Sequence, residues 1–205
     1  MEYRFAPAGG YEDVASGGRV LLHRSGQPPF PARLALELFG RARELAPKKE
    51  GLVVYDPFCG GGTLLTVIGF LAFRPFALLA GSDLDADALR TAEQNLALLS
   101  REGLLRRRQR LEALFSAYGK PSHRDAVESA ERLAARLPAV PLPTRVFQAD
   151  DPLPAFAAQI RAAMAPQGVL ALCASAAQAL PPFPGWQRLQ KQKIGKRRFA
   201  LYRAD

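Results

Sequence analysis

One stretch of the sequence brings glycines, a carboxylate and a thiol together in an order that suits ligand binding. Residues 52–67 read Leu-Val-Val-Tyr-Asp-Pro-Phe-Cys-Gly-Gly-Gly-Thr-Leu-Leu-Thr-Val. The β-branched and aromatic residues at its start predict a buried parallel strand, the glycines predict a turn, and the second apolar run has the length of a helix. Glycine has no Cβ and tolerates positive φ, so a ligand can approach the backbone of such a turn, and the helix beyond it presents free N–H groups.

Two common glycine motifs do not fit this turn. A dinucleotide fingerprint needs Gly-x-Gly-x-x-Gly, and Leu65 stands at its third glycine, while a P-loop needs a lysine that the turn lacks. The remaining pattern, Asp-Pro-Phe-Cys-Gly-Gly-Gly-Thr, resembles the first motif of S-adenosylmethionine-dependent methyltransferases, with Gly61 at a serine position. An ordinary tight turn in an α/β domain is the alternative interpretation. If S-adenosylmethionine is the cofactor, as the resemblance implies, the predicted contacts are Asp56, Pro57, Phe58, Cys59, Gly60, Gly61, Gly62 and Thr63.

Acidic residues also follow the next two expected strands. Asp83 and Leu84 come after the apolar run 76–82, and Asp83 lies 27 residues beyond the carboxylate of the glycine turn, a suitable βαβ spacing. A carboxylate at this strand end can accept hydrogen bonds from both ribose hydroxyls of a nucleoside, although a solvated turn aspartate is the alternative. Asp150, with Asp151 as its substitute, follows the third strand. In methyltransferases an acidic residue there commonly meets the adenine amino group.

The rest of the chain supplies elements that hold these residues in place. Pro31 suits the start of a helix that ends before Pro47. Asp85 can cap the helix after the second strand, where apolar residues recur every three or four positions. The other expected elements are a short strand at 20–22, a helix at 63–73, two helices within 100–143, the second of them at 126–137, a strand from 144, a helix at about 153–165, and strands at 168–173 and 198–202.

These elements predict a doubly wound, Rossmann-like α/β sheet of the methyltransferase type. The length of 205 residues favours one domain, 1–205, that can bury a substantial core. Within it, residues 1–47 form an N-terminal arm and helix, and residues 100–143 form a two-helix insert.

The charge balance favours an acidic partner. The net charge is +9 and the isoelectric point is about 10.1, which makes nucleic acid the expected partner, although a basic charge that serves only solubility is the alternative. Between residues 188 and 203 there are only basic charged side chains, whereas glutamates are interspersed in the insert, so a simple solvated face is an equal alternative there. The candidate RNA contacts are Arg106, Arg107, Arg108, Lys120, Lys191, Lys193, Lys196, Arg197 and Arg198.

Several other classes of protein are disfavoured. Cys59 and Cys173 have no CxxC partner or neighbouring histidine, so we expect no metal site and a reducing, cytoplasmic location. Cys59 is interpreted as a small packing residue in preference to a nucleophile. The apolar run 64–81 is interrupted at Arg74-Pro75, so we expect a buried helix and strand in place of a membrane span. The N-terminus has no signal-peptide pattern.

The assembled motifs resemble the avilamycin-resistance ribosomal RNA methyltransferases of the AviRa type. The matching stretches begin near residue 28 and are Phe-Pro-Ala-Arg-Leu-Ala at 30–35, Asp-Pro-Phe-Cys-Gly-Gly-Gly at 56–62, Leu-Leu-Thr-Val at 64–67, Ser-Asp-Leu-Asp at 82–85, Asn-Leu-Ala-Leu-Leu-Ser at 95–100, Gly-Lys-Pro-Ser at 119–122 and Lys-Ile-Gly at 193–195. The resemblance implies methylation of a guanine base in large-subunit ribosomal RNA, with S-adenosylmethionine as methyl donor and antibiotic resistance as a consequence.

The chain departs from this family after the third strand. The family's fourth strand ends in a motif such as Asp-Leu-Pro-Tyr-Gly, which receives the flipped base, and no such motif is found. Only 17 residues, 151–167, separate the third strand from Gly168, so we expect the fourth strand to be missing and residues 169–173 to pair with 53–55. The catalytic residues are therefore unknown; Tyr11, His23 and Ser175 are possible substitutes. The alternative function is binding of RNA or ribosomal particles without methyl transfer.

Overall fold

The computed structural model describes residues 3–14, 19–23, 30–72, 76–148, 160–162, 164–178, 180 and 185–204. The chain forms two compact units. We call residues 6–36 and 50–150 the glycine-loop unit, and residues 1–5, 37–49 and 151–205 the C-terminal unit. The expectation of a single domain stays a prediction.

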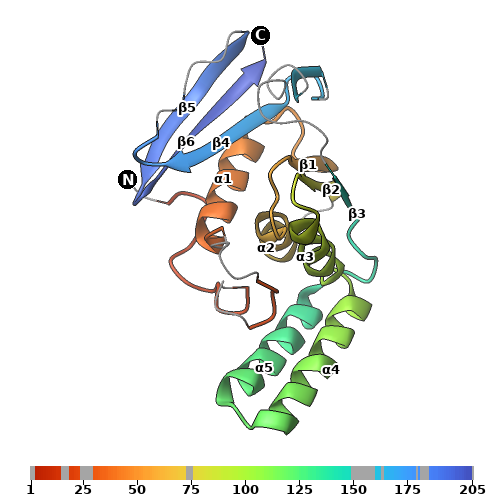
Figure 1. Ribbon diagram of the computed structural model, residues 1–205. Coiled ribbons are helices and arrows are strands. Elements are labelled where there is room, and N and C mark those ends of the chain that lie inside the picture. The colour runs from red at the N-terminus through yellow and green to blue at the C-terminus, as the bar shows by residue number, and fades with distance from the viewer. Residues whose placement is uncertain are drawn as a thin grey trace. The chain divides into compact units, whose positions relative to one another are not determined.

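The glycine-loop unit contains a parallel sheet with strand order β1-β2-β3 (Figure 1). Its strands are β1 (Leu52–Asp56), β2 (Phe76–Asp83) and β3 (Thr144–Gln148). Helix α2 (Thr63–Leu71) follows β1, and helix α3 (Ala86–Ala97) follows β2. The alternation of strand and helix confirms the predicted α/β class, and it brings the carboxyl ends of the three strands to one edge.

The core of this unit lies between the sheet and the two helices. Leu65 on α2, Leu79 on β2 and Leu96 on α3 are almost fully buried, and the burial of Leu96 confirms the apolar face that helical spacing predicted for α3. Gly69 allows close approach of the chain, because a Cβ there would lie 2.5 Å from a methyl group of Leu99. Tight packing of this kind fixes where the strand ends lie.

Two antiparallel helices, α4 (Arg101–Tyr118) and α5 (Pro121–Arg136), form a hairpin in the same unit (Figure 1). The predicted start of the second helix at residue 126 was wrong. Helix α5 begins five residues earlier because its proline occupies the first turn, where no backbone N–H is needed, and Gly119 at φ 61° ends α4. The buried side chains of the hairpin include Leu104, Leu111, Ala126, Ala130 and Leu133.

The C-terminal unit contains an antiparallel sheet with strand order β4-β6-β5, formed by β4 (Val169–Ser175), β5 (Trp186–Ile194) and β6 (Arg197–Ala204). One face of β6 contributes Ala200 and Tyr202 to a small core with Ile160, Leu180 and Trp186. The opposite face contacts α1 (Ala32–Leu45), where the guanidinium of Arg41 lies over the Phe199 ring at 5.7 Å and Arg203 Nη2 donates to the Leu45 carbonyl at 2.7 Å.

Two expectations about strands are corrected. The described strands are hydrogen-bonded in two sheets, so the expected pairing of 169–173 with 53–55 is not present; β4 pairs instead with β6 along its whole length. The expectation assumed that β1 lies between two other strands. In the described sheet β1 is instead an edge strand, which needs only β2 as its partner. Residues 20–22 do not form a strand, because the backbone groups of Leu22 bond to a side chain, that of Asn95. Most of the helix expected at 153–165 falls outside the described residues; 160–162 are helical.

Candidate functional site

The glycine turn between β1 and α2 has an open outer side. Gly60 and Gly62 have φ of 52° and 72°, in the region that favours glycine. The turn is held by two backbone hydrogen bonds, from Cys59 N to the Ser82 carbonyl at 2.9 Å and from Gly62 N to the Cys59 carbonyl at 2.8 Å. A Cβ added at Gly60 would meet nothing within 4 Å, so a ligand has room beside the backbone there.

Asp83, at the end of β2, is fixed against this turn. Its Oδ2 accepts a hydrogen bond from Gly60 N at 2.9 Å, and its Oδ1 accepts one from Asp85 N at 3.0 Å. A carboxylate has about four acceptor positions, so both oxygens retain capacity for hydroxyl donors. The strand end, the turn and the acceptor are thereby held together before any ligand binds.

Asp56, at the end of β1, is the second carboxylate at this edge. Burial raises its pKa to about 6; the hydrogen bond from Phe58 N, 3.2 Å from Oδ1, lowers the pKa, and the charge of Asp83 raises it. At pH 7 the carboxyl is still mostly ionised. Two carboxylates beside an open turn suit a ligand that carries ribose hydroxyls and a cationic group.

Cys59 is a packing residue, as the sequence indicated. Its side chain is buried, and burial together with the charges of Asp56 and Asp83 raises the pKa of the thiol to about 12. A thiol with this pKa stays protonated and is a poor nucleophile. It fits against β2 because residue 81 is glycine; a Cβ there would lie 2.9 Å from the Cys59 sulfur.

Two apolar side chains beside the turn are exposed to an unusual degree. Phe58 is 48% exposed and Leu84, which follows Asp83, is 50% exposed. Of the other predicted contacts, Thr63 begins α2 and is buried, and the carbonyl of Pro57 accepts a hydrogen bond from Ser82 Oγ at 3.3 Å. Exposed apolar surface beside a polar acceptor matches the mixed character of a nucleoside site.

The two acidic residues predicted to meet the adenine amino group, Asp150 and Asp151, lie outside the described residues.

The sequence reasoning missed Asn95 on α3, which is fully buried. Its Nδ2 donates to the Gly61 carbonyl at 2.7 Å and to the Leu22 carbonyl at 3.0 Å, and its Oδ1 accepts from Leu22 N at 2.8 Å. The side chain therefore ties the N-terminal segment to the glycine turn. The available signal was an amide within an otherwise apolar helix face, since a buried amide needs partners.

His23 directly follows this tethered residue. Its Nε2 is buried and has no hydrogen-bond partner among the described residues. Burial and the nearby charge of Arg107 lower its pKa below 6.5, so the imidazole is neutral at pH 7. The Tyr11 hydroxyl donates to the Pro7 carbonyl at 2.8 Å, and Ser175 lies in the C-terminal unit.

The candidate RNA contacts on α4 differ in their surroundings. Arg107 donates to the Val20 carbonyl at 2.8 Å and so holds the N-terminal segment. Arg106 pairs with Glu102, and Arg108 with Glu112 at 3.2 Å. These contacts leave the assignment of the three arginines to RNA a prediction.

The candidate contacts on the C-terminal sheet separate by face. Cross-strand pairing places Lys193 opposite Arg198, and Lys191 opposite Ala200 on the same face. Arg197 pairs with Ile194 and points to the other face, while Lys196 lies in the β5–β6 turn. Within the ranges that the structure describes, these five cations form no ion pair. Like charges placed opposite each other on a sheet are unfavourable without an anionic partner.

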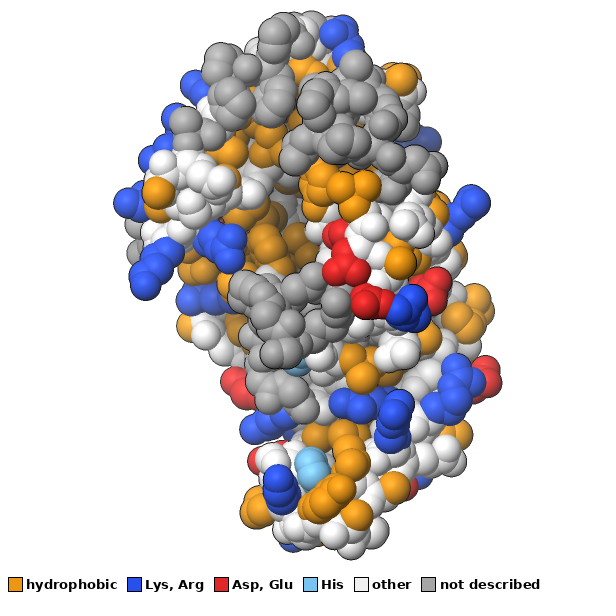
Figure 2. All heavy atoms as spheres, in the orientation of Figure 1, with side chains coloured by type: hydrophobic (Ala, Val, Ile, Leu, Met, Phe, Trp, Pro, Cys, Tyr) orange, Lys and Arg blue, Asp and Glu red, His pale blue; other side chains and the backbone are white. Residues whose placement is uncertain are grey.

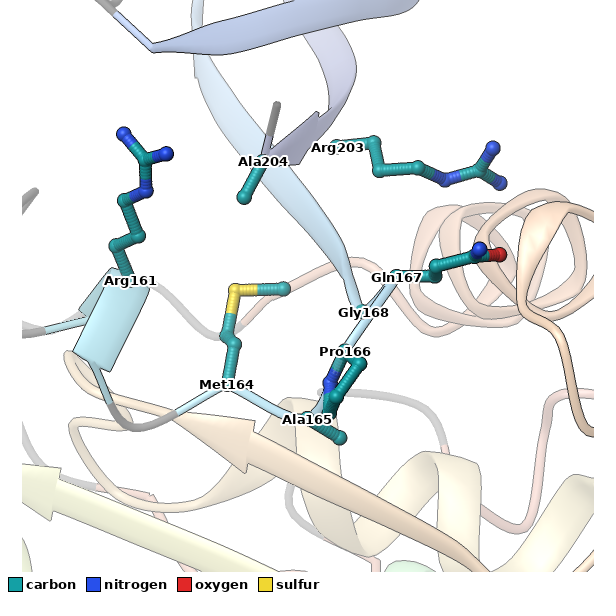
Figure 3. Close-up of a pocket in the computed structure, with 8 residues that line it drawn as sticks. All are labelled: Arg161, Met164, Ala165, Pro166, Gln167, Gly168, Arg203 and Ala204. Atoms are coloured by element: carbon teal, nitrogen blue, oxygen red, sulfur yellow. The ribbon is translucent and has the colours of Figure 1, made fainter.

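A cavity of about 470 Å³ lies in the C-terminal unit (Figure 3). Its lining contains Met164, Pro166 and Gly168 between the two arginines Arg161 and Arg203, and it shares no residue with the glycine turn. Within the described part of the chain, no group of three metal-ligating side chains is present, and no helix has the length and apolar character needed to cross a membrane.

The parallel sheet, the glycine turn and the alternation of strand and helix define a Rossmann-like α/β protein, with a candidate nucleoside site at the carboxyl ends of β1 and β2. The chain belongs to the AviRa family of ribosomal RNA methyltransferases, since the family model described as "RRNA methyltransferase AviRa" matches residues 1–150.

Relatives agree with this membership. The chain is 40% identical over 161 residues to the 23S rRNA (guanine(2535)-N(1))-methyltransferase of Streptomyces viridochromogenes. The match covers 77% of this chain and 64% of that protein, so the chain spans less than two thirds of this relative's length. Two solved structures of the rRNA methyltransferase aviRa from Streptomyces viridochromogenes are similar, with TM-scores of 0.90 and 0.89 at 31% identity, covering 99% of this chain and 96% of theirs.

Proposed function

We propose that the protein is an S-adenosylmethionine-dependent methyltransferase that acts on a guanine base of large-subunit ribosomal RNA. The observation that carries the proposal is the carboxylate of Asp83, held by Gly60 N at 2.9 Å beside an open glycine turn in a chain of the AviRa family. The 23S rRNA relative is named for methylation at N1 of guanine, which makes N1 the proposed acceptor atom.

The described residues fit the proposed cofactor. Asp83 would accept hydrogen bonds from the ribose, and the open backbone at Gly60 would lie along the methionine part. Asp56 would face the ammonium group, and Phe58 and Leu84 would cover apolar surface of the nucleoside. Asp150, proposed to meet the adenine amino group, is outside the described residues. When bound, S-adenosylmethionine supplies a methyl group on a cationic sulfur.

The protein's own contribution is positioning and removal of a proton. Methyl transfer is an in-line displacement, so a fixed approach of the acceptor nitrogen provides much of the rate. Guanine N1 carries a proton that must leave, and His23 is our candidate to accept it. The imidazole is neutral at pH 7, and it follows the residue that Asn95 ties to the glycine turn.

The basic surface supports an RNA substrate. Lys191, Lys193 and Arg198 share one face of the C-terminal sheet and form no ion pair within the described ranges. Phosphates would relieve the repulsion between them. Action on ribosomes places the protein in the cytoplasm, and methylation of the ribosome would confer resistance to avilamycin; both are part of the proposal.

A second candidate function is binding of RNA or ribosomal particles without methyl transfer. The short interval between β3 and β4 favours it, because 151–167 has no room for a further strand with a base-binding motif and its two flanking helices. This protein would keep the cofactor site and the basic surface.

Radiolabelled methyl transfer distinguishes the two functions. The protein is incubated with methyl-labelled S-adenosylmethionine and either protein-free or subunit-assembled ribosomal RNA, and the product nucleoside is identified by mass spectrometry. Label on a guanine supports the enzyme. Binding of RNA and cofactor without label supports the second function, and label on another nucleoside contradicts the proposed substrate.

A further inference from the structure

The free end of the α4–α5 hairpin carries an exposed aromatic surface. We call Phe115, Tyr118, Lys120, His123 and Arg124 the tip patch. Tyr118 is 65% exposed and Phe115 is 36% exposed, three residues apart on one side of α4. Figure 2 shows hydrophobic side chains gathered over this end of the hairpin, with Lys and Arg side chains beside them.

The Tyr118 ring has a defined orientation. The His123 ring meets it edge to face, with centroids 6.2 Å apart and planes at 66°, and Lys120 Nζ lies 6.0 Å from its centroid. Gly119, in the left-handed conformation, turns the chain so that these side chains meet. The ring is thus partly ordered before anything binds to it, which lowers the entropic cost of stacking.

Packing within the hairpin does not explain this exposure. Of the hairpin's buried side chains, Leu111 is the last on α4 and Ala126 is the first on α5, so the final turns of α4 lie beyond the packed seam. A tyrosine that only covered the helix end would bury its ring against that seam. An exposed ring beside a cation is instead a typical surface for a flat ligand.

Charge identifies the ligand as anionic. The hairpin, residues 101–136, has nine Lys and Arg against five Asp and Glu. Four of these acids are paired with arginines of the same hairpin: Glu102, Glu112, Glu131 and Glu128, the last of them with Arg124 at 3.8 Å. Lys120 has no ion pair within the described ranges, so its ammonium group is available to a phosphate. A flat ring system attached to phosphate is a nucleotide.

We propose that the tip patch binds an unpaired nucleotide of the RNA substrate, with its base stacked on Tyr118 and its flanking phosphates on Lys120 and Arg124. An unpaired base is required because the bases of an RNA duplex are stacked on one another and cannot reach the ring. The inference rests on the proposed function, since it supplies a contact to the same RNA at a place outside the cofactor site.

The first test measures binding of two RNA probes to the full-length protein. One probe is a single-stranded RNA of about 15 nucleotides that contains 2-aminopurine, and the other is a duplex of the same length. Tyr118→Ala should weaken single-strand binding about tenfold and abolish the stacking quench of 2-aminopurine, with little effect on the duplex. Tyr118→Phe should retain both signals. Leu105→Ala is the matched control, since it removes an equally apolar exposed side chain about 20 Å away on the same helix.

The second test separates this inference from the proposed function. In the methyl-transfer assay with ribosomal RNA, Tyr118→Ala should raise KM and leave kcat unchanged. If wild type and Tyr118→Ala methylate with equal KM and bind both probes equally, the assignment of the tip patch as a nucleotide-binding site is wrong, and the proposed function stands. If Tyr118→Ala weakens binding to assembled subunits but not to protein-free RNA, the partner is a ribosomal protein and the inference is overturned. If wild type binds no RNA, both proposals fail.

Discussion

Asn95 and Gly61 are joined by a hydrogen bond of 2.7 Å from the side-chain amide to the backbone carbonyl. The same amide group bonds both backbone groups of Leu22. Asn95→Ala should therefore destabilise the protein by about 1–3 kcal/mol, because three partly buried backbone groups, of Leu22 and Gly61, lose their partner. Urea unfolding measures the change. Gln94→Ala, at the exposed neighbouring position, is the control and should stay within about 0.5 kcal/mol of wild type.

Asp83 tests the cofactor proposal. Asp83→Ala should weaken S-adenosylmethionine binding by about 1–3 kcal/mol, because ribose hydroxyls lose their acceptor and Gly60 N loses its bond. Calorimetry gives the affinity. Asp87→Ala is the matched control, since it removes a carboxylate that pairs with Arg90 at the surface of α3. Equal affinities for wild type and Asp83→Ala would contradict the assignment.

Asp56 predicts a pH-dependent difference in stability. Its pKa is raised from 3.8 to about 6 in the folded protein, mainly by burial, so the stability that it contributes is fully present below pH 3.8 and is lost as pH rises through 6. The variant Asp56→Asn has no titrating carboxyl at this position, so it does not lose stability in this way as the pH rises. Between pH 4 and pH 7 the stability of the variant should therefore rise relative to wild type by up to about 3 kcal/mol. Other groups with shifted pKa values, such as Glu37, whose pKa is lowered, affect both proteins alike, so their contributions cancel in the difference in stability between the variant and wild type.

Urea unfolding at a series of pH values gives this difference directly. A constant difference between Asp56→Asn and wild type across the range would show that the carboxyl is not perturbed. The variant should also bind S-adenosylmethionine more weakly at pH 7, because the proposed partner of the ammonium group is neutral there.

Local sequence signals predicted the glycine-loop unit well. The β1 turn, the buried face of α3 and the cap formed by Asp85, which accepts from Asp87 N and Ala88 N, all depend on residues near each other in the chain. Such features follow from backbone conformation and short-range hydrogen bonds.

Features that depend on distant segments were not predicted. The sequence does not show that Asn95 meets Leu22 across 73 positions, nor that β4 pairs with β6 in a second sheet. The exposure of the Tyr118 ring was not predicted either, because it also depends on how distant segments pack. Tyr118 and Leu111 are both apolar residues of α4, and only the packed hairpin separates the exposed ring from the buried side chain.

The cations of the C-terminal sheet predict a salt-dependent association with RNA. Binding should weaken with salt by about 0.7–0.9 log units per log unit for each phosphate contact. Replacing Lys191, Lys193 and Arg198 by glutamine should flatten that slope by about 2–3, because the three side chains share one face. Filter binding over a salt series measures the slope.

A second triple variant controls for net charge. Arg4, Lys48 and Arg90 lie outside the candidate RNA surfaces, and their replacement by glutamine removes the same three charges. The salt dependence of this variant should have the wild-type slope, to within the contribution of about one phosphate contact. Equal flattening in both variants would mean that bulk charge, and not the shared face, determines binding.

His23 is the last test, because it addresses the missing base-binding motif. His23→Ala should lower kcat for methyl transfer by about 10²–10⁴-fold, the range for a lost general base, with unchanged affinity for S-adenosylmethionine. Because its pKa lies below 6.5, wild-type activity should rise with pH through that lowered value and then level off, and the variant should lose this inflection. Tyr11→Phe and Ser175→Ala, made singly, should retain the wild-type pH profile. Transfer that continues at the wild-type rate when Tyr11, His23 and Ser175 are all replaced would exclude these residues and leave the proton to the RNA or to solvent.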